Sequence, residues 1–318
     1  MTRLADCIIE SGYHLNGDNV GNWLQSIVQL LGDFTKYDST FGPLPFPVEI
    51  EGEGLRIGER LIAFSSHNDL GNTDLPAVDI VLECTGKITS REAAERGLGA
   101  GARAVLISGP SKFADKTVVL GANEGALGAE PIISNSSCTT NAIAPLLRTV
   151  DAQLGIERAH VTTIHCYTSS QPMVDAPRGD LARSRAGAES IVPTTTSAEL
   201  ELQGILPQVG ARTSVAAVRV PSLSVSAIDV TLQLKSAVGA DLCAVVRAFA
   251  AASDVIGITE DPCVSRDLRG RAESLVLAVP ETQTIGPHQL RLFGWYDNEW
   301  GFSARMINMA RKMVARST

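Results

Sequence analysis

A cysteine set among small hydroxyl residues is the clearest candidate nucleophile in the sequence. Cys138 lies in segment 134–141, Ser-Asn-Ser-Ser-Cys-Thr-Thr-Asn, directly before the apolar run 142–150. That run predicts a helix, with Ser136 or Ser137 as a good N-cap. A thiol at a helix N-terminus faces unpaired backbone N–H groups in a positive partial field, which favours the nucleophilic thiolate. The same groups could later hold an oxyanion. The alternative is a buried structural cysteine beside a helix cap.

A histidine near the end of a predicted strand supplies a matching base. His165 lies in segment 161–168, Val-Thr-Thr-Ile-His-Cys-Tyr-Thr, whose apolar and β-branched residues predict a strand. A cysteine nucleophile needs a neighbouring base, and imidazole titrates near neutrality. We therefore expect Cys138 and His165 to act together, with a packed or surface histidine as the alternative.

Together with two further segments, these residues resemble the phosphorylating glyceraldehyde-3-phosphate dehydrogenase family. The matching blocks, in the family's order, are Ser134–Asn141, Thr162–His165, Arg219–Pro221 and Trp295–Glu299. The resemblance extends from about Lys36 to the C-terminus. It implies an α/β Rossmann-like nucleotide domain, 1–137 with 303–318, and an α+β catalytic domain, 138–302, with a mostly antiparallel sheet.

The resemblance also implies a reaction. The Cys138 thiolate would attack the aldehyde of glyceraldehyde 3-phosphate to give a thiohemiacetal, and hydride would pass to NAD or NADP. Inorganic phosphate would then release the acyl group as 1,3-bisphosphoglycerate. His165 would activate the cysteine and handle protons, an effect of roughly 10²–10⁴-fold in rate.

Two alternative functions remain open. The closer one is the sister enzyme acting on erythrose 4-phosphate, which segments 281–290 and 298–302 resemble. Thr168 and Thr196 favour glyceraldehyde 3-phosphate instead. The more distant alternative is a cofactor-impaired or truncated homologue with a binding role.

Two anion sites follow from the resemblance, and arginine forks and hydroxyl groups suit both. Thr168 and Arg219 would bind the substrate phosphate. The residues implied for the attacking phosphate are Ser137, Thr139, Thr196 and Arg183. Thr139 and the helix amides would also face developing negative charge.

Three positions qualify this assignment. Ser170 stands where many members of the family have threonine or aspartate. Ser197 stands where glycine is usual, so its side chain could crowd a phosphate held by the backbone. Segment 177–192 resembles the family's long loop at the subunit interface, and we interpret its Arg178 and Arg185 as solvated loop charges.

The N-terminal end departs from the family. A dinucleotide-binding domain opens with a strand, a Gly-x-Gly-x-x-Gly turn and a helix, and residues 1–35 contain no such fingerprint. The glycines at 52–58 have the wrong spacing and flank a hairpin-like segment. Segment 97–102 fits a Gly-x-Gly-x-x-Ala form but leads into a strand. We therefore expect weakened cofactor binding, with the choice between NAD and NADP open.

The rest of the cofactor cleft is placed by resemblance. Thr85, Gly86 and Ser108 would line it, and Asn298 would hold the nicotinamide amide. The first three lie toward the ends of segments that predict elements of a parallel sheet: strands at 79–86 and 104–110 with a crossover helix at 91–97.

Beyond Cys138 the hydrophobic pattern changes to alternation, as in half-buried antiparallel strands. The expected strands are 227–234, 274–279 and 289–296, and the expected helices are 240–252 and 303–315. This pattern predicts an α+β domain beside the α/β one.

Composition limits the remaining possibilities. The 318 residues are 44% hydrophobic and 19% charged, which predicts packed globular structure. The net charge of −8 argues against nucleic acid or a membrane as the main partner. Asp6 and Glu10 interrupt any signal-peptide core, so we expect a cytoplasmic protein. The family resemblance implies a homotetramer. The six cysteines show no metal spacing and are too sparse for a disulfide scaffold.

Overall fold

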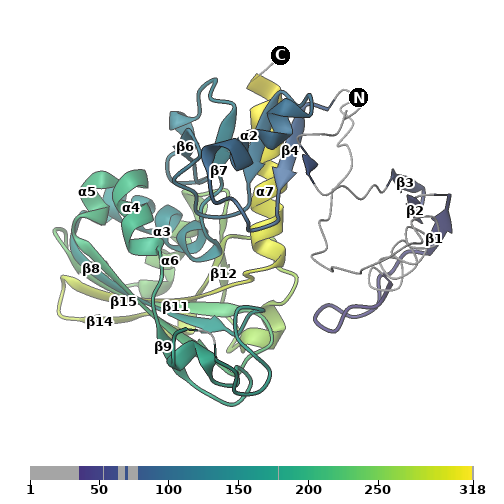
Figure 1. The fold of residues 1–318 in the computed structure, drawn as a ribbon. Coiled ribbons are helices and arrows are strands. Elements are labelled where there is room, and N and C mark those ends of the chain that lie inside the picture. Colours follow the sequence, from purple (N-terminus) through teal and green to yellow (C-terminus); the bar gives the residue numbers. More distant parts are fainter. Residues whose placement is uncertain (1–35, 53, 64–68, 71–77, 178, 317–318) are drawn as a thin grey trace. The chain divides into compact units, whose positions relative to one another are not determined.

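The computed structural model describes residues 36–52, 54–63, 69–70, 78–177 and 179–316 (Figure 1). Two compact units divide the chain, 1–106 and 107–318. The segment without a fingerprint, 1–35, and the loop residue Arg178 lie outside the described residues. The predicted domain boundaries, 1–137 with 303–318 and 138–302, stay a prediction.

Unit 1 contains a three-stranded antiparallel sheet in the order β1-β2-β3. The strands are β1 (Val48–Glu51), β2 (Gly54–Ile57) and β3 (Arg60–Ala63). The turn between β2 and β3 lies at Gly58, whose φ of +58° suits glycine. Gly52 and Gly58 therefore lie in connections between antiparallel strands and Gly54 begins β2, as the hairpin-like segment predicts.

A strand–helix–strand segment follows, as predicted. It consists of β4 (Ile80–Glu83), α2 (Arg91–Gly99) and β5 (Ala104–Ile107). The Ser90 side chain caps α2 by accepting a hydrogen bond from the Ala93 N–H at 3.1 Å. A Cβ added to Gly97 would lie 2.8 Å from Val105 and 3.0 Å from Val81. Gly97 thus allows α2 to pack closely on both strands, and segment 97–102 serves this packing.

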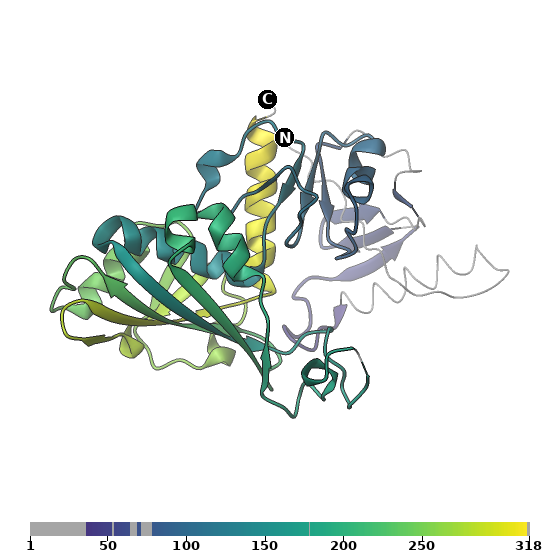
Figure 2. The ribbon, with the colours of Figure 1, turned by 60° about the vertical axis from the view of Figure 1, so that its left-hand side comes forward.

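Unit 2 is built on an eight-stranded sheet in the order β12-β13-β15-β11-β8-β10-β9, with β14 paired to β15 (Figure 2). The strands are β8 (Ile156–Cys166), β9 (Val192–Thr194), β10 (Thr213–Val220), β11 (Ser226–Leu234), β12 (Ile256–Thr259), β13 (Leu275–Ala278), β14 (Gln283–Ile285) and β15 (Gln289–Tyr296). The pairs β8–β10 and β12–β13 are parallel, and the other neighbouring pairs are antiparallel. The predicted mostly antiparallel sheet is confirmed.

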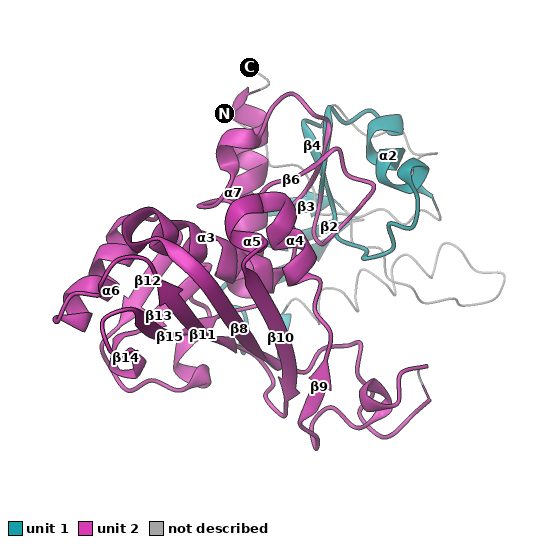
Figure 3. Cartoon of the chain, turned by 90° about the vertical axis from the view of Figure 1, so that its left-hand side faces the viewer, with its two compact units in different colours: residues 1–106 teal, residues 107–318 magenta. Residues whose placement is uncertain are grey.

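The helices of unit 2 pack around α3, which contacts β8, β11 and β13. They are α3 (Cys138–Leu154), α4 (Ala198–Ile205), α5 (Pro207–Gly210), α6 (Leu242–Ala251) and α7 (Trp300–Arg316). Figure 3 shows α3, α4 and α5 over one face of the sheet. Ile143, Leu146 and Leu147 of α3 are fully buried. The helix that begins with the candidate nucleophile is therefore also a central element of the core.

Short elements complete the described part of the chain. The strands β6 (Lys116–Thr117) and β7 (Ile132–Ser134) pair in parallel. The 3₁₀ helices are η2 (Glu124–Ala126), η3 (Ala182–Ser184), η4 (Ser265–Leu268) and η5 (Val279–Glu281). The predicted fold class, a Rossmann-like α/β part and an α+β part with a mostly antiparallel sheet, is confirmed.

Candidate active site

The connection from β7 to α3 places Cys138 in the first turn of a helix. Ser136, in this connection, has a φ of +62°, a left-handed conformation that is uncommon for residues with a side chain. Ser137 is the N-cap, because its Oγ accepts a hydrogen bond from the Thr140 N–H at 3.1 Å. Of the two predicted caps, the structure therefore selects Ser137.

The end of β8 places His165 against the thiol. The Cys138 Sγ lies 3.5 Å from the His165 Nε2. The His165 Nδ1 lies 2.7 Å from the Cys166 carbonyl oxygen. A carbonyl oxygen only accepts hydrogen bonds, so Nδ1 carries the proton and donates. Nε2 of the neutral ring then presents its lone pair to the sulfur, which is the orientation that a general base needs.

Burial sets the charge state of this pair. It raises the pKa of the Cys138 thiol to about 11, against hydrogen bonds from Thr139 that lower it. It also lowers the pKa of His165 to about 4, against the hydrogen bond to Cys166 that raises it. In the ligand-free chain burial therefore favours a thiol and a neutral imidazole. This effect opposes the helix-start field that we expected to favour the thiolate, so the charge state of Cys138 stays a prediction.

Tyr296 packs against His165 and bonds to Thr139, the residue after Cys138, and the sequence analysis missed these contacts. Its hydroxyl lies 3.0 Å from the Thr139 Oγ1 and 2.7 Å from the Thr163 Oγ1. Its ring meets the His165 ring edge to face, with centroids 6.0 Å apart and planes at 77°. Burial raises the pKa of Tyr296, so the phenol stays protonated and can donate. The alternating pattern of β15 marked Tyr296 as buried but gave no sign of this contact.

Arg219 and Thr168 come together as predicted. Arg219 lies beside His165 in the β10–β8 register, and its Nη1 donates to the Thr168 Oγ1 at 2.6 Å. It also donates to the Gln171 Oε1 at 3.4 Å, a partner that the sequence analysis missed. Burial lowers the pKa of Arg219. Among the described residues no carboxylate forms an ion pair with it, so this half-buried cation is suited to an anion.

Arg183 and Thr196 belong to the loops beside this cation. The Arg183 Nε donates to the Thr194 Oγ1 at 2.6 Å, and its charge lowers the pKa of Arg219 after the larger effect of burial. The Thr196 Oγ1 accepts a hydrogen bond from the Ala198 N–H at 3.2 Å. Arg183 and Arg219 are thus close enough to repel each other, and each of them contacts a threonine hydroxyl group. The assignment of each arginine to a phosphate stays a prediction.

Two of the qualifying positions are now described. Ser197 is exposed and has a φ of −75°, which any residue adopts, so its backbone needs no glycine. Arg185 is exposed and pairs with Asp175 at 2.6 Å. This exposure agrees with its interpretation as a solvated loop charge, which stays a prediction.

The residues predicted for the attacking phosphate have protein partners. The Ser137 N–H and Oγ lie 3.2 Å and 3.3 Å from the Glu201 Oε2. The Thr140 hydroxyl donates to the same oxygen at 2.7 Å, and the Ser136 hydroxyl donates to it as well. Thr139 is 4% exposed and its hydroxyl bonds to Tyr296 instead. Sequence reasoning missed Glu201, since nothing in α4 indicated that it meets a segment about 60 residues earlier.

The Asn298 side chain is held through its amide oxygen. Its Oδ1 accepts hydrogen bonds from the Cys166 Sγ at 3.2 Å and from the Ser226 Oγ at 3.1 Å. The described residues offer no partner to its amide nitrogen, which therefore can donate to a carboxamide oxygen. The residues present fit the nicotinamide end of NAD or NADP.

The other predicted cofactor residues lie at strand ends. Thr85 and Gly86 follow β4, and the Thr85 N–H donates to the Glu83 Oε1 at 2.9 Å. Gly86 has a φ of +68°, which glycine adopts without strain. Ser108 directly follows β5 and is half-buried. Their cofactor roles stay predictions.

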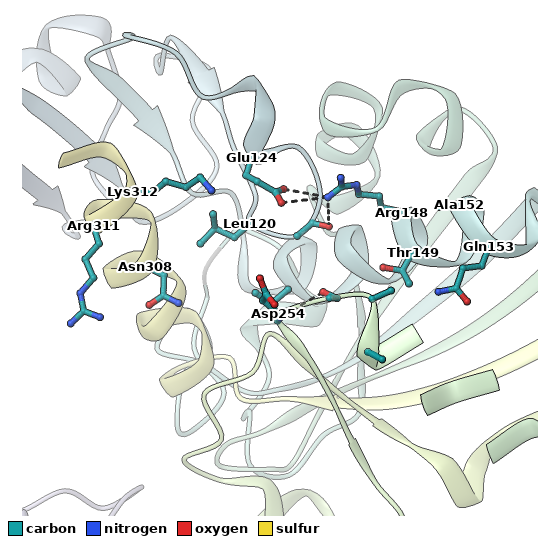
Figure 4. A pocket seen from close by; sticks show the side chains of 15 residues that line it. Leu120, Glu124, Arg148, Thr149, Ala152, Gln153, Asp254, Asn308, Arg311 and Lys312 are labelled. Carbon is teal, nitrogen blue, oxygen red and sulfur yellow. Dashed lines mark hydrogen bonds and ion pairs between the residues drawn. The ribbon is translucent and has the colours of Figure 1, made fainter. Parts of the chain in front are cut away.

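A separate cavity of about 830 Å³ lies along the second half of α3 (Figure 4). Side chains of α3 and α7 line it, including Arg148, Gln153, Asn308 and Lys312. Arg148 forms an ion pair with Glu124 there at 3.4 Å. None of the predicted site residues lines this cavity, so its size does not mark the place of the chemistry.

Two further classes of site were searched for. The described ranges contain no group of three or more histidine, cysteine, aspartate or glutamate side chains placed to hold a metal ion. In the same ranges, every helix is too short or too polar to cross a membrane.

Comparison with known proteins agrees with the sequence resemblance. The family model described as glyceraldehyde 3-phosphate dehydrogenase, C-terminal domain, matches residues 137–298. The glyceraldehyde-3-phosphate dehydrogenase of Geobacillus stearothermophilus is 37% identical over 293 residues, covering 90% of this chain and 88% of the relative. The enzymes of that name from Pseudomonas aeruginosa and Kitasatospora aureofaciens are 39% and 40% identical. They cover 88% of this chain each, and 85% and 86% of the relatives.

Proposed function

Because this chain belongs to the glyceraldehyde-3-phosphate dehydrogenase family, we propose that it oxidises glyceraldehyde 3-phosphate to 1,3-bisphosphoglycerate. The reaction runs through a thiohemiacetal and a thioester on Cys138, with NAD or NADP as oxidant and inorganic phosphate as acyl acceptor. The observation that carries this proposal is the 3.5 Å approach of the Cys138 Sγ to the His165 Nε2.

The first step is attack on the aldehyde. As the Cys138 sulfur bonds to the aldehyde carbon, its proton passes to the His165 Nε2, while Nδ1–H stays on the Cys166 carbonyl. The resulting imidazolium and the first-turn amides of α3 face the new alkoxide and stabilise it. Burial favours the uncharged forms of both partners, so in this mechanism the proton moves as the carbon–sulfur bond forms.

The second step forms the thioester. When bound, NAD or NADP would accept the hydride, and the Asn298 amide would hold its carboxamide. The His165 imidazolium first returns its proton to the alkoxide, which gives the thiohemiacetal hydroxyl group and a neutral imidazole. His165 then takes the hydroxyl proton as the hydride leaves the carbon, and Tyr296 keeps the imidazole ring in place. Fixing the base within reach of both the sulfur and the hydroxyl group lowers the entropy lost in reaching the transition state.

Substrate orientation is assigned to Thr168 and Arg219. A guanidinium and a hydroxyl group 2.6 Å apart form a two-point contact for a phosphate. Arg219 lies opposite His165 in the register of neighbouring strands, so the phosphate end of a three-carbon aldehyde is anchored near the base. The proposal also includes the homotetramer, which light scattering of the purified chain tests.

A steady-state assay tests the proposal. Glyceraldehyde 3-phosphate and erythrose 4-phosphate are each supplied with NAD or NADP, with and without inorganic phosphate. We expect reduction of the cofactor with glyceraldehyde 3-phosphate, abolished by Cys138→Ser and retained by Cys263→Ser, a variant of a partly exposed cysteine. The KM values for NAD and NADP measure the expected weakening of cofactor binding. Faster turnover of erythrose 4-phosphate would support the sister function, and the absence of turnover would support a binding role.

A further inference from the structure

One carboxylate oxygen, the Glu201 Oε2, accepts hydrogen bonds from several residues that flank Cys138 in sequence. It accepts from the Ser137 N–H at 3.2 Å, the Ser137 hydroxyl at 3.3 Å and the Thr140 hydroxyl at 2.7 Å. The Ser136 hydroxyl also donates to it. This arrangement ties the first turn of α4 to the first turn of α3, because Glu201 lies in α4 and Thr140 in α3.

The second oxygen of the same carboxylate is in a different situation. The Glu201 Oε1 is buried and has no hydrogen-bond partner among the described residues. A buried acceptor without a donor is unfavourable, so the carboxylate is held on one side only. A group with two or three acceptor oxygens would use these donors more completely.

The donors that Glu201 occupies include those required for the acyl acceptor. Under the proposed function, inorganic phosphate approaches the thioester on Cys138 at Ser137. The Ser137 N–H and hydroxyl are among the groups that hold the Glu201 carboxylate. Phosphate and the Glu201 carboxylate are both anions. They would repel each other at this site and would accept hydrogen bonds from the same donors.

We propose that Glu201 is a built-in competitor of inorganic phosphate at the acyl-acceptor site, so that it sets how tightly phosphate binds. This inference rests on the proposed function. Phosphate binds when the Glu201 carboxylate gives up its hydrogen bonds to these donors. The thioester on Cys138 reacts with phosphate only after that exchange. The affinity for phosphate is therefore low while the affinity for the aldehyde, which depends on Arg219, is unaffected.

A cavity beside Glu201 offers space for the carboxylate to move into. Glu201 also lines a cavity of about 480 Å³, together with Lys112 and Lys116. A side chain that rotates out of the α3 start would enter this space beside Lys112, whose positive charge would offset part of the hydrogen bonding that it gives up, while Lys116 already pairs with Glu130.

Calorimetric titration of inorganic phosphate into the cofactor-free protein tests the inference without requiring turnover. We expect Glu201→Ala to lower the Kd for phosphate at least about tenfold relative to the unchanged chain, or ~1.4 kcal/mol. Glu201→Gln should lie between them, because the amide keeps the shape and one acceptor but loses the charge. Circular dichroism checks that each variant is folded, and the Gln variant serves if the Ala variant is not.

Glu199→Gln is the matched control. It removes a carboxylate from the same helix, but Glu199 accepts its hydrogen bond from the Val215 N–H at 3.0 Å. The control should leave the Kd for phosphate unchanged. The predicted substrate-phosphate site at Arg219 is common to all these proteins, so differences between them report on Glu201.

The KM for phosphate in turnover provides a second measurement, and the outcomes separate the two proposals. Turnover with a phosphate Kd and KM that Glu201→Ala and Glu201→Gln leave unchanged would overturn the competitor role and keep the proposed function. Tighter phosphate binding by Glu201→Ala, without turnover in any variant, would support the competitor role and contradict the proposed function.

Discussion

Around Cys138 and His165, other groups of the protein fill the hydrogen-bonding positions of the polar side chains. Around Arg219, by contrast, the cationic side chains contact only neutral groups in the described part of the chain. The His165 Nδ1 is held by a backbone carbonyl, and the Tyr296 hydroxyl is held by two threonines. Arg219 contacts a threonine hydroxyl and a glutamine amide. Under the proposed function, the reacting groups are therefore arranged before substrate arrives, and the anion of the substrate completes the binding region.

The difference has an electrostatic basis. Burial keeps Cys138 and His165 neutral, so their contact carries no charge to desolvate. The guanidinium of Arg219 stays charged and half-buried beside a second cation, Arg183, and a bound phosphate relieves that repulsion. Removing a group from the first region should lower kcat, and removing one from the second should raise KM.

The largest effect is expected for His165→Asn. It removes the base and leaves the thiol without a proton acceptor, so kcat should fall by roughly 10²–10⁴-fold with little change in KM. His160→Asn is the control, because His160 is exposed on the same strand and bonds to Ser214 at 2.8 Å. A loss of less than about threefold for His165→Asn would show that proton transfer does not limit the reaction.

The pH dependence of Cys138 alkylation tests the neutral state of the pair. Since burial raises the Cys138 pKa to about 11, the group is protonated at neutral pH. The thiolate fraction then rises about tenfold per pH unit, so labelling by iodoacetamide should become about 100-fold faster from pH 6 to pH 8. Peptide mass spectrometry assigns the label to Cys138. A rate that levels off below pH 8 would reveal a thiolate–imidazolium pair instead.

At the binding end, Arg219→Ala should raise the KM for the phosphorylated aldehyde. Loss of a charged hydrogen bond costs about 1.5–3 kcal/mol, or roughly 10–150-fold in affinity. Arg185→Ala is the control, because Arg185 forms an exposed ion pair with Asp175. An unchanged KM in an active Arg219→Ala enzyme would place the substrate phosphate elsewhere.

The smallest expected effect is a difference in the free energy of unfolding between a variant of each region. Tyr296→Phe removes the hydroxyl shared by Thr139 and Thr163, so the free energy of unfolding should fall by about 1–2 kcal/mol. At the binding end Thr168→Val should change it by less than about 0.5 kcal/mol while raising KM. Urea denaturation measures both. Equal losses for the two variants would contradict the view that only the catalytic region is internally satisfied.

The sequence predicted the parts of the site that depend on local structure. The helix start at Cys138, the strand end at His165 and the cap at Ser137 follow from residues within a few positions of each other. The pairing of Thr168 with Arg219 came through the family resemblance rather than from spacing. The hairpin-like glycines and the Gly97 segment were interpreted correctly because a cofactor fingerprint requires a strand before it and a helix after it.

The contacts that the sequence could not predict join distant segments. Tyr296 meets Thr139 across 157 positions, and Glu201 meets Ser136 across 65 positions. Periodicity marks a side chain as buried without naming its neighbours. The effect of burial on the pKa of Cys138 was also missed, because a helix field can be inferred from sequence while burial is known only after the chain has packed.

The dual role of α3 has a thermal consequence. Cys138 is the first residue of a helix whose Ile143, Leu146 and Leu147 are fully buried. A nucleophile fixed to a core helix cannot be displaced by loosening a surface loop, since its backbone moves only when the core opens. Heating should therefore inactivate the catalytic residue and melt unit 2 in one cooperative transition, without an earlier temperature at which the fold survives and the thiol has lost its place.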